Sequence, residues 1–182
     1  ADTARWFMLS DSPPGRDINW SESGVKGAWK FINKVWNLIN NNKELFNEKL
    51  SLKNNESKKY KELKKITHKS LNDITSSIES FKMNVAVAKI YEMTNFISLF
   101  NPDNDDEKFA LKESLEILIR VLEPMVPHLA EECWLIIGNK DLLSGKPWPD
   151  VDQKYIKDDK AHIVIQVNGK KRAIIEVENN SK

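Results

Sequence analysis

The residues best suited to chemistry lie together in the stretch PMVPHLAEECW, residues 124–134. His128, Glu131 and Glu132 are spaced i, i+3 and i+4, so on a helix they would share one face, and Cys133 follows directly. Such a set could bind a metal ion or transfer a proton. Zinc catalysis, however, needs three protein ligands in a context such as H-E-x-x-H, which this sequence lacks.

The same stretch is also explained as the start of a helix. Pro127 suits the first turn, and Glu131 and Glu132 suit the positive end of the helix dipole. The only other imidazoles, those of His68 and His162, lie in unrelated segments. The buried side of the helix would consist of Leu129, Cys133 and Trp134. We therefore predict a structural role for this stretch and no catalytic or metal-binding residue in the chain, with a metalloenzyme as the least favoured alternative.

Other catalytic signatures are missing from the sequence. The chain has six glycines, and none belongs to a GxGxxG or GxxxxGK phosphate loop. Its single cysteine excludes an internal disulfide and fits a reducing compartment, so we expect a cytoplasmic protein. No apolar run of about 18 residues occurs, and no membrane partner is expected.

Basic residues give a stronger indication of function. The formal net charge is only +1, but residues 1–100 carry 16 Lys and Arg against 11 Asp and Glu, which favours a polyanionic partner. The densest stretch, SKKYKELKKITHK, has six lysines, among them Lys58, Lys59 and Lys65, and one glutamate. These lysines could contact phosphates, but a solvated helix face explains them as well on composition alone.

A second basic strip is expected on the helix that begins near Ser21. Its apolar residues step by 4, 3, 4 and 3 positions and predict a seam facing a bundle, formed by Val25, Trp29, Ile32, Trp36 and Ile39. The opposite side would carry Lys26, Lys30, Asn33, Lys34 and Asn37. Lysine and amide side chains in one strip can reach both phosphates and 2′-hydroxyls of RNA. Tryptophans at seam positions are expected in the core rather than as platforms for base stacking.

Helical periodicity dominates the chain up to about residue 150. We expect long helices from about residue 21, over 57–80, over 83–100, around 109–122, and from about 127 to a stop at Gly138. A short helix is expected at residues 2–9, before the prolines of SDSPPGRDINW break it. The prediction is an all-α, antiparallel bundle of about five helices.

The character of the sequence changes after residue 150. Two β-branched runs flank Asn168 and Gly169, which predicts a β-hairpin with a two-residue turn that places Ile163 opposite Ile174. A lone hairpin is marginal in water, so we expect it to begin a small domain that is truncated here. The chain would then divide into a junction segment (1–20), a helical domain (21–150), and a linker with the hairpin (151–182).

The chain resembles bacterial-type leucyl-tRNA synthetases, class I enzymes, in several stretches. ADTARWFMLSDSPPGRDINWSESGVKGAWKFINKVW resembles the segment after their KMSKS catalytic loop. FKMNVAVAKIYEMTNFI, LEPMVPHLAEECW, PWPDVD and IVIQVNGKKRA follow in the family's order. The stretches SPPGRDINWSESGVKGA and QVNGKKR favour the leucyl family over the isoleucyl, valyl and methionyl ones. Gly15 departs from the family, which usually has an acidic residue there.

The resemblance implies a helical domain of the anticodon-binding type between the catalytic domain and a small C-terminal domain. The family ligates leucine to its tRNA with ATP and magnesium, but the HIGH motif, the KMSKS loop and the editing insertion are missing from this sequence. The family's catalytic residues therefore match no position here. The chain alone should hold no cofactor and be inactive as a ligase. Its implied partners are leucine tRNA and the remaining synthetase domains, and not DNA.

We therefore predict that this domain supports and orients the tRNA body, so that the 3′ end reaches a catalytic site elsewhere. The predicted RNA contacts are Arg16, Lys26, Lys30, Asn33 and Lys34, with Lys58, Lys59 and Lys65 as a secondary group. The alternative is a helical protein-interaction module whose basic face meets an acidic protein.

Overall fold

The computed structural model describes residues 1–13, 15–53, 56–156, 160–167 and 170–178. Its helices are α1 (Asp2–Asp11), α2 (Glu22–Asn42), α3 (Lys58–Glu79), α4 (Met83–Leu99), α5 (Asp105–Leu122), α6 (Pro127–Ile136) and the short α7 (Gln153–Ile156), with 3-10 turns at Lys43–Asn47 and Leu143–Gly145. The predicted all-α bundle is confirmed, because α2 to α6 correspond to the five long helices expected from the sequence.

Polar side chains begin three of the long helices. Ser21, near which this helix was expected to begin, accepts a hydrogen bond from the backbone N–H of Gly24 (3.3 Å) and so caps α2. Ser57 and Asn104 accept equivalent bonds at the starts of α3 and α5. Each cap satisfies a backbone donor that has no partner inside the helix, which typically contributes about 1 kcal/mol.

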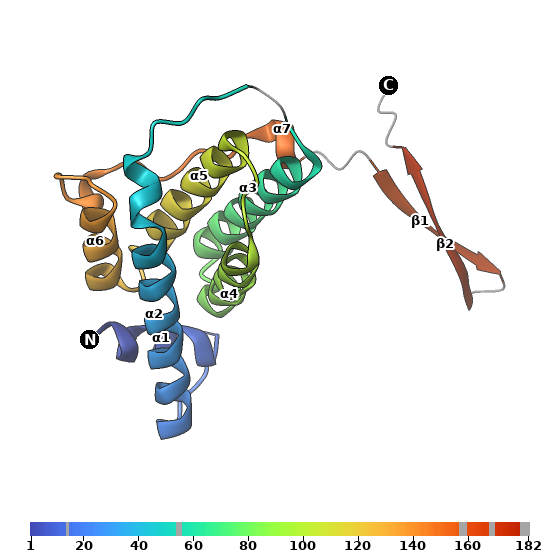
Figure 1. Cartoon of the computed structure of the whole chain (residues 1–182). Coiled ribbons are helices and arrows are strands. Elements are labelled where there is room, and N and C mark those ends of the chain that lie inside the picture. Colours follow the sequence, from blue (N-terminus) through green and yellow to red (C-terminus); the bar gives the residue numbers. More distant parts are fainter. Residues whose placement is uncertain (14, 54–55, 157–159, 168–169, 179–182) are drawn as a thin grey trace.

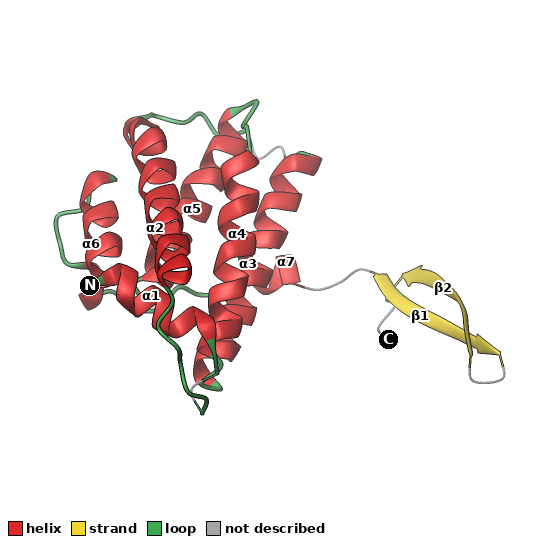
Figure 2. Ribbon diagram, turned by 90° about the horizontal axis from the view of Figure 1, so that it is seen from below, coloured by secondary structure: helices red, strands yellow, loops and turns green. Residues whose placement is uncertain are grey.

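The bundle consists of two groups of helices that share one core (Figures 1 and 2). One group is α3, α4 and α5, and the other is α2 with α1 and α6. Helix α1 joins the groups, because Trp6 stacks on Phe31 of α2 with ring centroids 4.5 Å apart and donates a hydrogen bond to the hydroxyl of Tyr91 of α4 (3.1 Å). The centre of the core includes Leu63, Leu71, Ile74, Ile90, Leu115 and Leu118.

Strands β1 (Lys160–Val167) and β2 (Lys170–Glu178) pair antiparallel (Figure 1). Val167 lies opposite Lys170, but the register shifts between Ile165 and Gln166, so that Ile163 lies opposite Ile175. The predicted pairing with Ile174 is therefore wrong by one residue, because β2 contains one extra residue in a bulge. The turn expected at positions 168 and 169 lies outside the described residues, and the three-part division of the chain stays a prediction.

Among the residues that the structure describes, no helix combines the length and the apolar character needed to cross a membrane.

Candidate nucleic-acid interface

The outer face of α2 carries four of the five residues predicted as primary RNA contacts. Lys26, Lys30 and Lys34 are exposed, and Asn33 is half-buried. The amide of Asn33 donates to the carbonyl oxygen of Trp29 (2.8 Å), which leaves its side-chain oxygen as an acceptor. Lys34 lies at the edge of this face and donates to the side-chain oxygen of Asn95 on α4 (2.6 Å), which is a neutral partner.

The fifth predicted contact, Arg16, lies in the loop before α2. Its side chain is exposed, and its backbone N–H donates to the carbonyl of Pro13 (3.0 Å), which forms a turn. Trp20 follows in the same loop, is 66% exposed and meets Phe7 edge-on with centroids 5.4 Å apart. The loop thus joins the beginning of α2 to the end of α1.

The predicted tryptophan seam of α2 is wrong at Trp29, whose side chain is 57% exposed. The residues that α2 buries are Ala28, Phe31, Ile32, Val35 and Ile39. Positions 26, 29, 30 and 33 share a helical face, so Trp29 lies among the lysines and not opposite them. The prediction assigned the largest apolar residues to the buried side of the helix. In the structure the small Ala28 is buried instead, and the indole of Trp29 is exposed.

The lysine-rich stretch of α3 does not form one basic face. Lys58 and Lys65 are exposed, but Lys59 forms an ion pair with Asp103 (2.6 Å), which raises the lysine's pKa. Lys64 points inward and is only 7% exposed. Of the secondary RNA contacts, therefore, Lys59 has part of its charge offset by an acidic neighbour.

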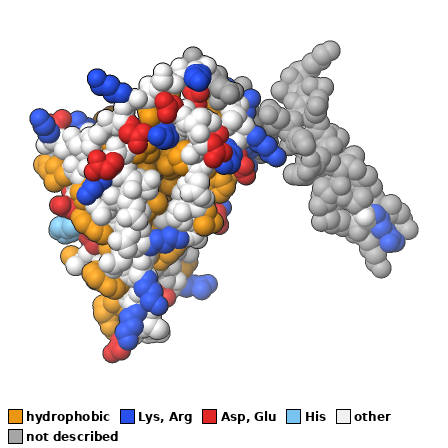
Figure 3. Space-filling model, in the orientation of Figure 1, with side chains coloured by type: hydrophobic (Ala, Val, Ile, Leu, Met, Phe, Trp, Pro, Cys, Tyr) orange, Lys and Arg blue, Asp and Glu red, His pale blue; other side chains and the backbone are white. Residues whose placement is uncertain are grey.

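The two predicted groups of RNA contacts lie at different ends of the molecule. The N-terminal half of α2 lies at the lower end in Figure 1, and the N-terminal half of α3 lies at the upper end, beside α7. Figure 3 shows basic side chains at the lower end of the molecule and others spread over the upper part, where acidic side chains lie among them. The structure brings Lys26, Lys30 and Asn33 together, and separates them from Lys58, Lys59 and Lys65.

A buried polar cluster joins α3, α5 and α7. The ammonium of Lys64 donates to the carboxylate of Glu113, and the second oxygen of this carboxylate lies 3.3 Å from Nε2 of His68. Burial tends to raise the pKa of Glu113, but the bonds from His68 and Lys64 outweigh it and lower the pKa. The ring of Tyr155 stacks on His68 with centroids 5.5 Å apart and lies 5.0 Å from the Lys64 ammonium.

The tautomer of His68 follows from its neighbours. The backbone N–H of Asp152 donates to Nδ1 (3.2 Å), so this nitrogen is an acceptor and the ring proton sits on Nε2, facing Glu113. The cluster thereby holds the segment around α7 on α3. Sequence reasoning missed it, because nothing local indicates that Lys64 and His68 share a partner 45 or more residues away.

The stretch PMVPHLAEECW begins α6, with Pro127 in the first turn as predicted. The carboxylate of Asp2 caps this helix, accepting from the backbone N–H of Leu129 (2.7 Å) and lying 2.8 Å from Nδ1 of His128. Glu131 accepts from the backbone N–H groups of Leu143 and Ser144, a different role from the dipole interaction expected for it. The histidine and this glutamate thus face separate structural partners.

Cys133 is enclosed in the core. Burial raises the pKa of its thiol to about 12, so it is neutral and unsuited to act as a nucleophile or metal ligand. No group of three or more His, Cys, Asp or Glu side chains placed to hold a metal ion occurs within the described ranges.

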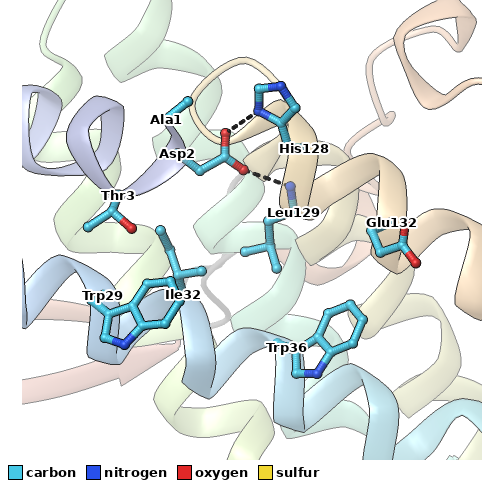
Figure 4. Close-up of a pocket in the computed structure, with 9 residues that line it drawn as sticks. All are labelled: Ala1, Asp2, Thr3, Trp29, Ile32, Trp36, His128, Leu129 and Glu132. Carbon is cyan, nitrogen blue, oxygen red and sulfur yellow. Dashed lines mark hydrogen bonds and ion pairs between the residues drawn. The ribbon is translucent and has the colours of Figure 1, made fainter.

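An open groove of about 450 Å³ lies between α2, α6 and the beginning of α1 (Figure 4). Trp29 and Trp36 project along α2, while His128 and Glu132 lie across from them on α6. Between these walls lie Ile32 and Leu129. The groove therefore combines apolar surface, exposed aromatic rings and two polar groups next to the lysine face of α2.

Comparisons with known proteins identify relatives of the chain. Residues 61–182 match the family model "Anticodon-binding domain of tRNA ligase". A leucine–tRNA ligase of Parvibaculum lavamentivorans is 40% identical over 173 residues, and one of Afipia carboxidovorans is 41% identical over 189 residues. These matches cover 94% and 100% of the chain but 20% and 21% of the relatives, so the chain spans about a fifth of their length.

A solved structure has the same fold. It is the leucyl-tRNA synthetase of Agrobacterium radiobacter K84 in a ternary complex with tRNA and LeuAMS. The match has a TM-score of 0.84, at 24% identity, and covers 100% of this chain and 23% of that one.

Proposed function

The chain belongs to the anticodon-binding domain family of tRNA ligases, and from this membership we propose that it binds leucine tRNA as part of a leucine–tRNA ligase. The observation that carries the proposal is the outer face of α2. Lys26 and Lys30 are exposed there and form no ion pair with any residue that the structure describes. Two uncompensated ammonium groups one helical turn apart match the negative charge of an RNA backbone.

The proposed contacts divide by chemistry. Lys26, Lys30 and Lys34 neutralise phosphates, and Arg16 reaches the backbone from the preceding loop. Asn33 has one hydrogen-bonding oxygen left over, which can accept a bond from a ribose 2′-hydroxyl. Because α2 packs against both α1 and α6, the contacts at Lys26, Lys30, Asn33 and Lys34 are held on a rigid element.

In the whole ligase this domain would hold the tRNA body while a catalytic domain joins leucine to the 3′ end. That reaction would use ATP and magnesium bound outside the present residues, and the enzyme would work in the cytoplasm. Lys58, Lys59 and Lys65 would form a second, weaker RNA contact at the other end of the bundle. The domain's contribution to the rate is orientation, because a correctly placed acceptor end makes the attack effectively intramolecular.

The test is the salt dependence of tRNA binding, measured by fluorescence anisotropy with labelled leucine tRNA. The three phosphate contacts of α2 would contribute about −2.7 to the slope of log K against log salt, which corresponds to a fall in affinity of about 40-fold from about 50 to about 200 mM salt. The variant K26Q/K30Q/K34Q should lose most of this slope. The matched control K49Q/K82Q/K140Q removes the same charge from three exposed lysines elsewhere and should keep it.

Two results would contradict the proposal. One is an unchanged slope in K26Q/K30Q/K34Q, which would move the RNA contacts away from α2. The other is equal competition by an acidic polypeptide of matched charge, which would favour the protein-interaction module instead.

A further inference from the structure

Trp29 is an exposed indole set among basic side chains. It follows Lys26 by three positions and precedes Lys30 by one, so the three residues share the solvent face of α2. The combination matters because nucleic acids without base pairing are bound by lysines along the backbone and by aromatic rings under the bases.

The groove beside Trp29 has room for a planar ring. Figure 4 shows Trp29 and Trp36 along one wall, with Ile32 and Leu129 between the two walls. Its volume of about 450 Å³ falls within the range of small-molecule sites, and the apolar lining favours a flat, weakly hydrated group. Both walls belong to long helices of the bundle, so the groove is preformed.

We propose that this groove binds an unstacked nucleobase of RNA, with the base on Trp29 and the adjoining phosphates on Lys26 and Lys30. The inference rests on the proposed function and adds to it a base-binding site. Paired RNA presents no free base face, so the site is selective for unpaired nucleotides.

The charges around the groove favour RNA over a peptide. The two oxygens of the Asp2 carboxylate are directed at Nδ1 of His128 and at the backbone N–H of Leu129 in α6, so they are already occupied as hydrogen-bond acceptors. Lys26 and Lys30 remain available on the adjoining face and are complementary to phosphate. A protein segment would need acidic side chains to match them, yet an acidic segment would meet Glu132 inside the groove.

The remaining polar groups predict a base preference. Glu132 is exposed on α6 and can accept a hydrogen bond from the exocyclic amine of adenine, cytosine or guanine, but uracil has no such amine. His128 uses Nδ1 towards Asp2, which leaves Nε2 free for a second hydrogen bond. Oligoadenylate should therefore bind more tightly than oligouridylate.

The experiment compares single-stranded oligoadenylate with an RNA duplex of the same length, using the whole chain and anisotropy. Loss of one base stack in W29A should weaken oligoadenylate binding by about 5- to 150-fold and leave duplex binding unchanged. W29F keeps an aromatic face and should retain most of the affinity. F81A removes a different exposed aromatic, at the turn between α3 and α4, and should change nothing.

The outcomes separate this inference from the proposed function. If leucine tRNA shows its salt-dependent binding while W29A and the wild-type chain bind oligoadenylate equally, the base site is overturned and the proposed function stands. If the wild-type chain binds no RNA at low salt, both fail. E132A tests the polar wall independently, because it removes the acceptor and should reduce the preference for oligoadenylate over oligouridylate, and an undiminished preference would remove Glu132 from the site.

Discussion

Replacing Glu113 with glutamine tests whether the buried polar cluster holds α3, α5 and α7 together. Glutamine keeps the size of the side chain and removes its charge. The Lys64 ammonium, 7% exposed, then loses its counter-charge, and Nε2 of His68 loses the carboxylate 3.3 Å away. We expect E113Q to unfold at a clearly lower temperature than the wild-type chain.

The magnitude follows from the burial of the two partners. Removing one member of a fully buried ion pair costs about 3–5 kcal/mol, because the other charge is left without compensation. The Glu113 side chain is 30% exposed, so water can partly solvate the abandoned ammonium, and we expect about 2–3 kcal/mol. For a chain of this size that corresponds to a fall in Tm of about 4–12 °C.

Calorimetry of three variants measures the effect. The double variant E113Q/K64M should recover part of the loss, because it also removes the ammonium that E113Q leaves without a counter-charge. The control D103N breaks the exposed Lys59–Asp103 pair, which water screens, and should leave Tm almost unchanged. An E113Q Tm equal to that of the wild-type chain would refute the structural role assigned to the cluster.

The pH dependence of the same variant has a definite sign. The folded-state pKa of Glu113 is lowered from its usual value of 4.5, so its contribution to stability is present above that value and is lost as the pH falls through the folded pKa. The stability difference between the wild-type chain and E113Q should therefore shrink in acid. A difference that stays constant from neutral pH to below the lowered pKa would contradict the ionised state of Glu113.

Two further predictions concern helix starts and close packing. D2A removes the cap of α6 and should lower the free energy of unfolding, measured by chemical denaturation, by about 1–2 kcal/mol. H128A leaves the bond between Asp2 and Leu129 in place and should lower it by less than about 0.5 kcal/mol. Equal losses of stability in the two variants would contradict the capping role of Asp2. A Cβ at Gly24 would lie 2.5 Å from the ring of Phe7, so G24A should destabilise the fold by about 1 kcal/mol. A Cβ at Gly27 meets no neighbour, so G27A should stabilise the fold by about 0.5–1 kcal/mol. Stability changes of the same sign in both variants would refute the close contact between Gly24 and Phe7.

The helices could be predicted from the sequence because their signals are local. Ser21, Pro127 and the spacing of apolar residues mark where helices start and which segments are amphipathic. The orientation of α2 was less predictable, because Trp29 is apolar and its spacing fits the buried side of the helix. Which side is buried depends on how Ala28 and Phe31 pack against neighbouring helices. That decision changes the candidate site, because it moves an indole to the lysine face.

The long-range polar contacts of the bundle could not be predicted, because they join distant parts of the chain. Asp2 reaches the backbone of Leu129, and Lys64 reaches Glu113. A single sequence indicates that acids and bases are present but not which of them meet. The bulge in β2 has the same origin, since the register of a strand depends on its partner.

The contact between the first and last helices of the bundle has a consequence for synthesis on the ribosome. Asp2 and Arg5 pair with backbone groups 119 to 127 residues later, at Pro124, Met125 and Leu129. At translation rates of about 5–20 residues per second, these partner residues are synthesised on the order of 6 to 25 seconds after α1. Helices α3, α4 and α5 lie close together in the chain and can fold first. We expect α1 to dock late, completing the bundle after α6 has emerged.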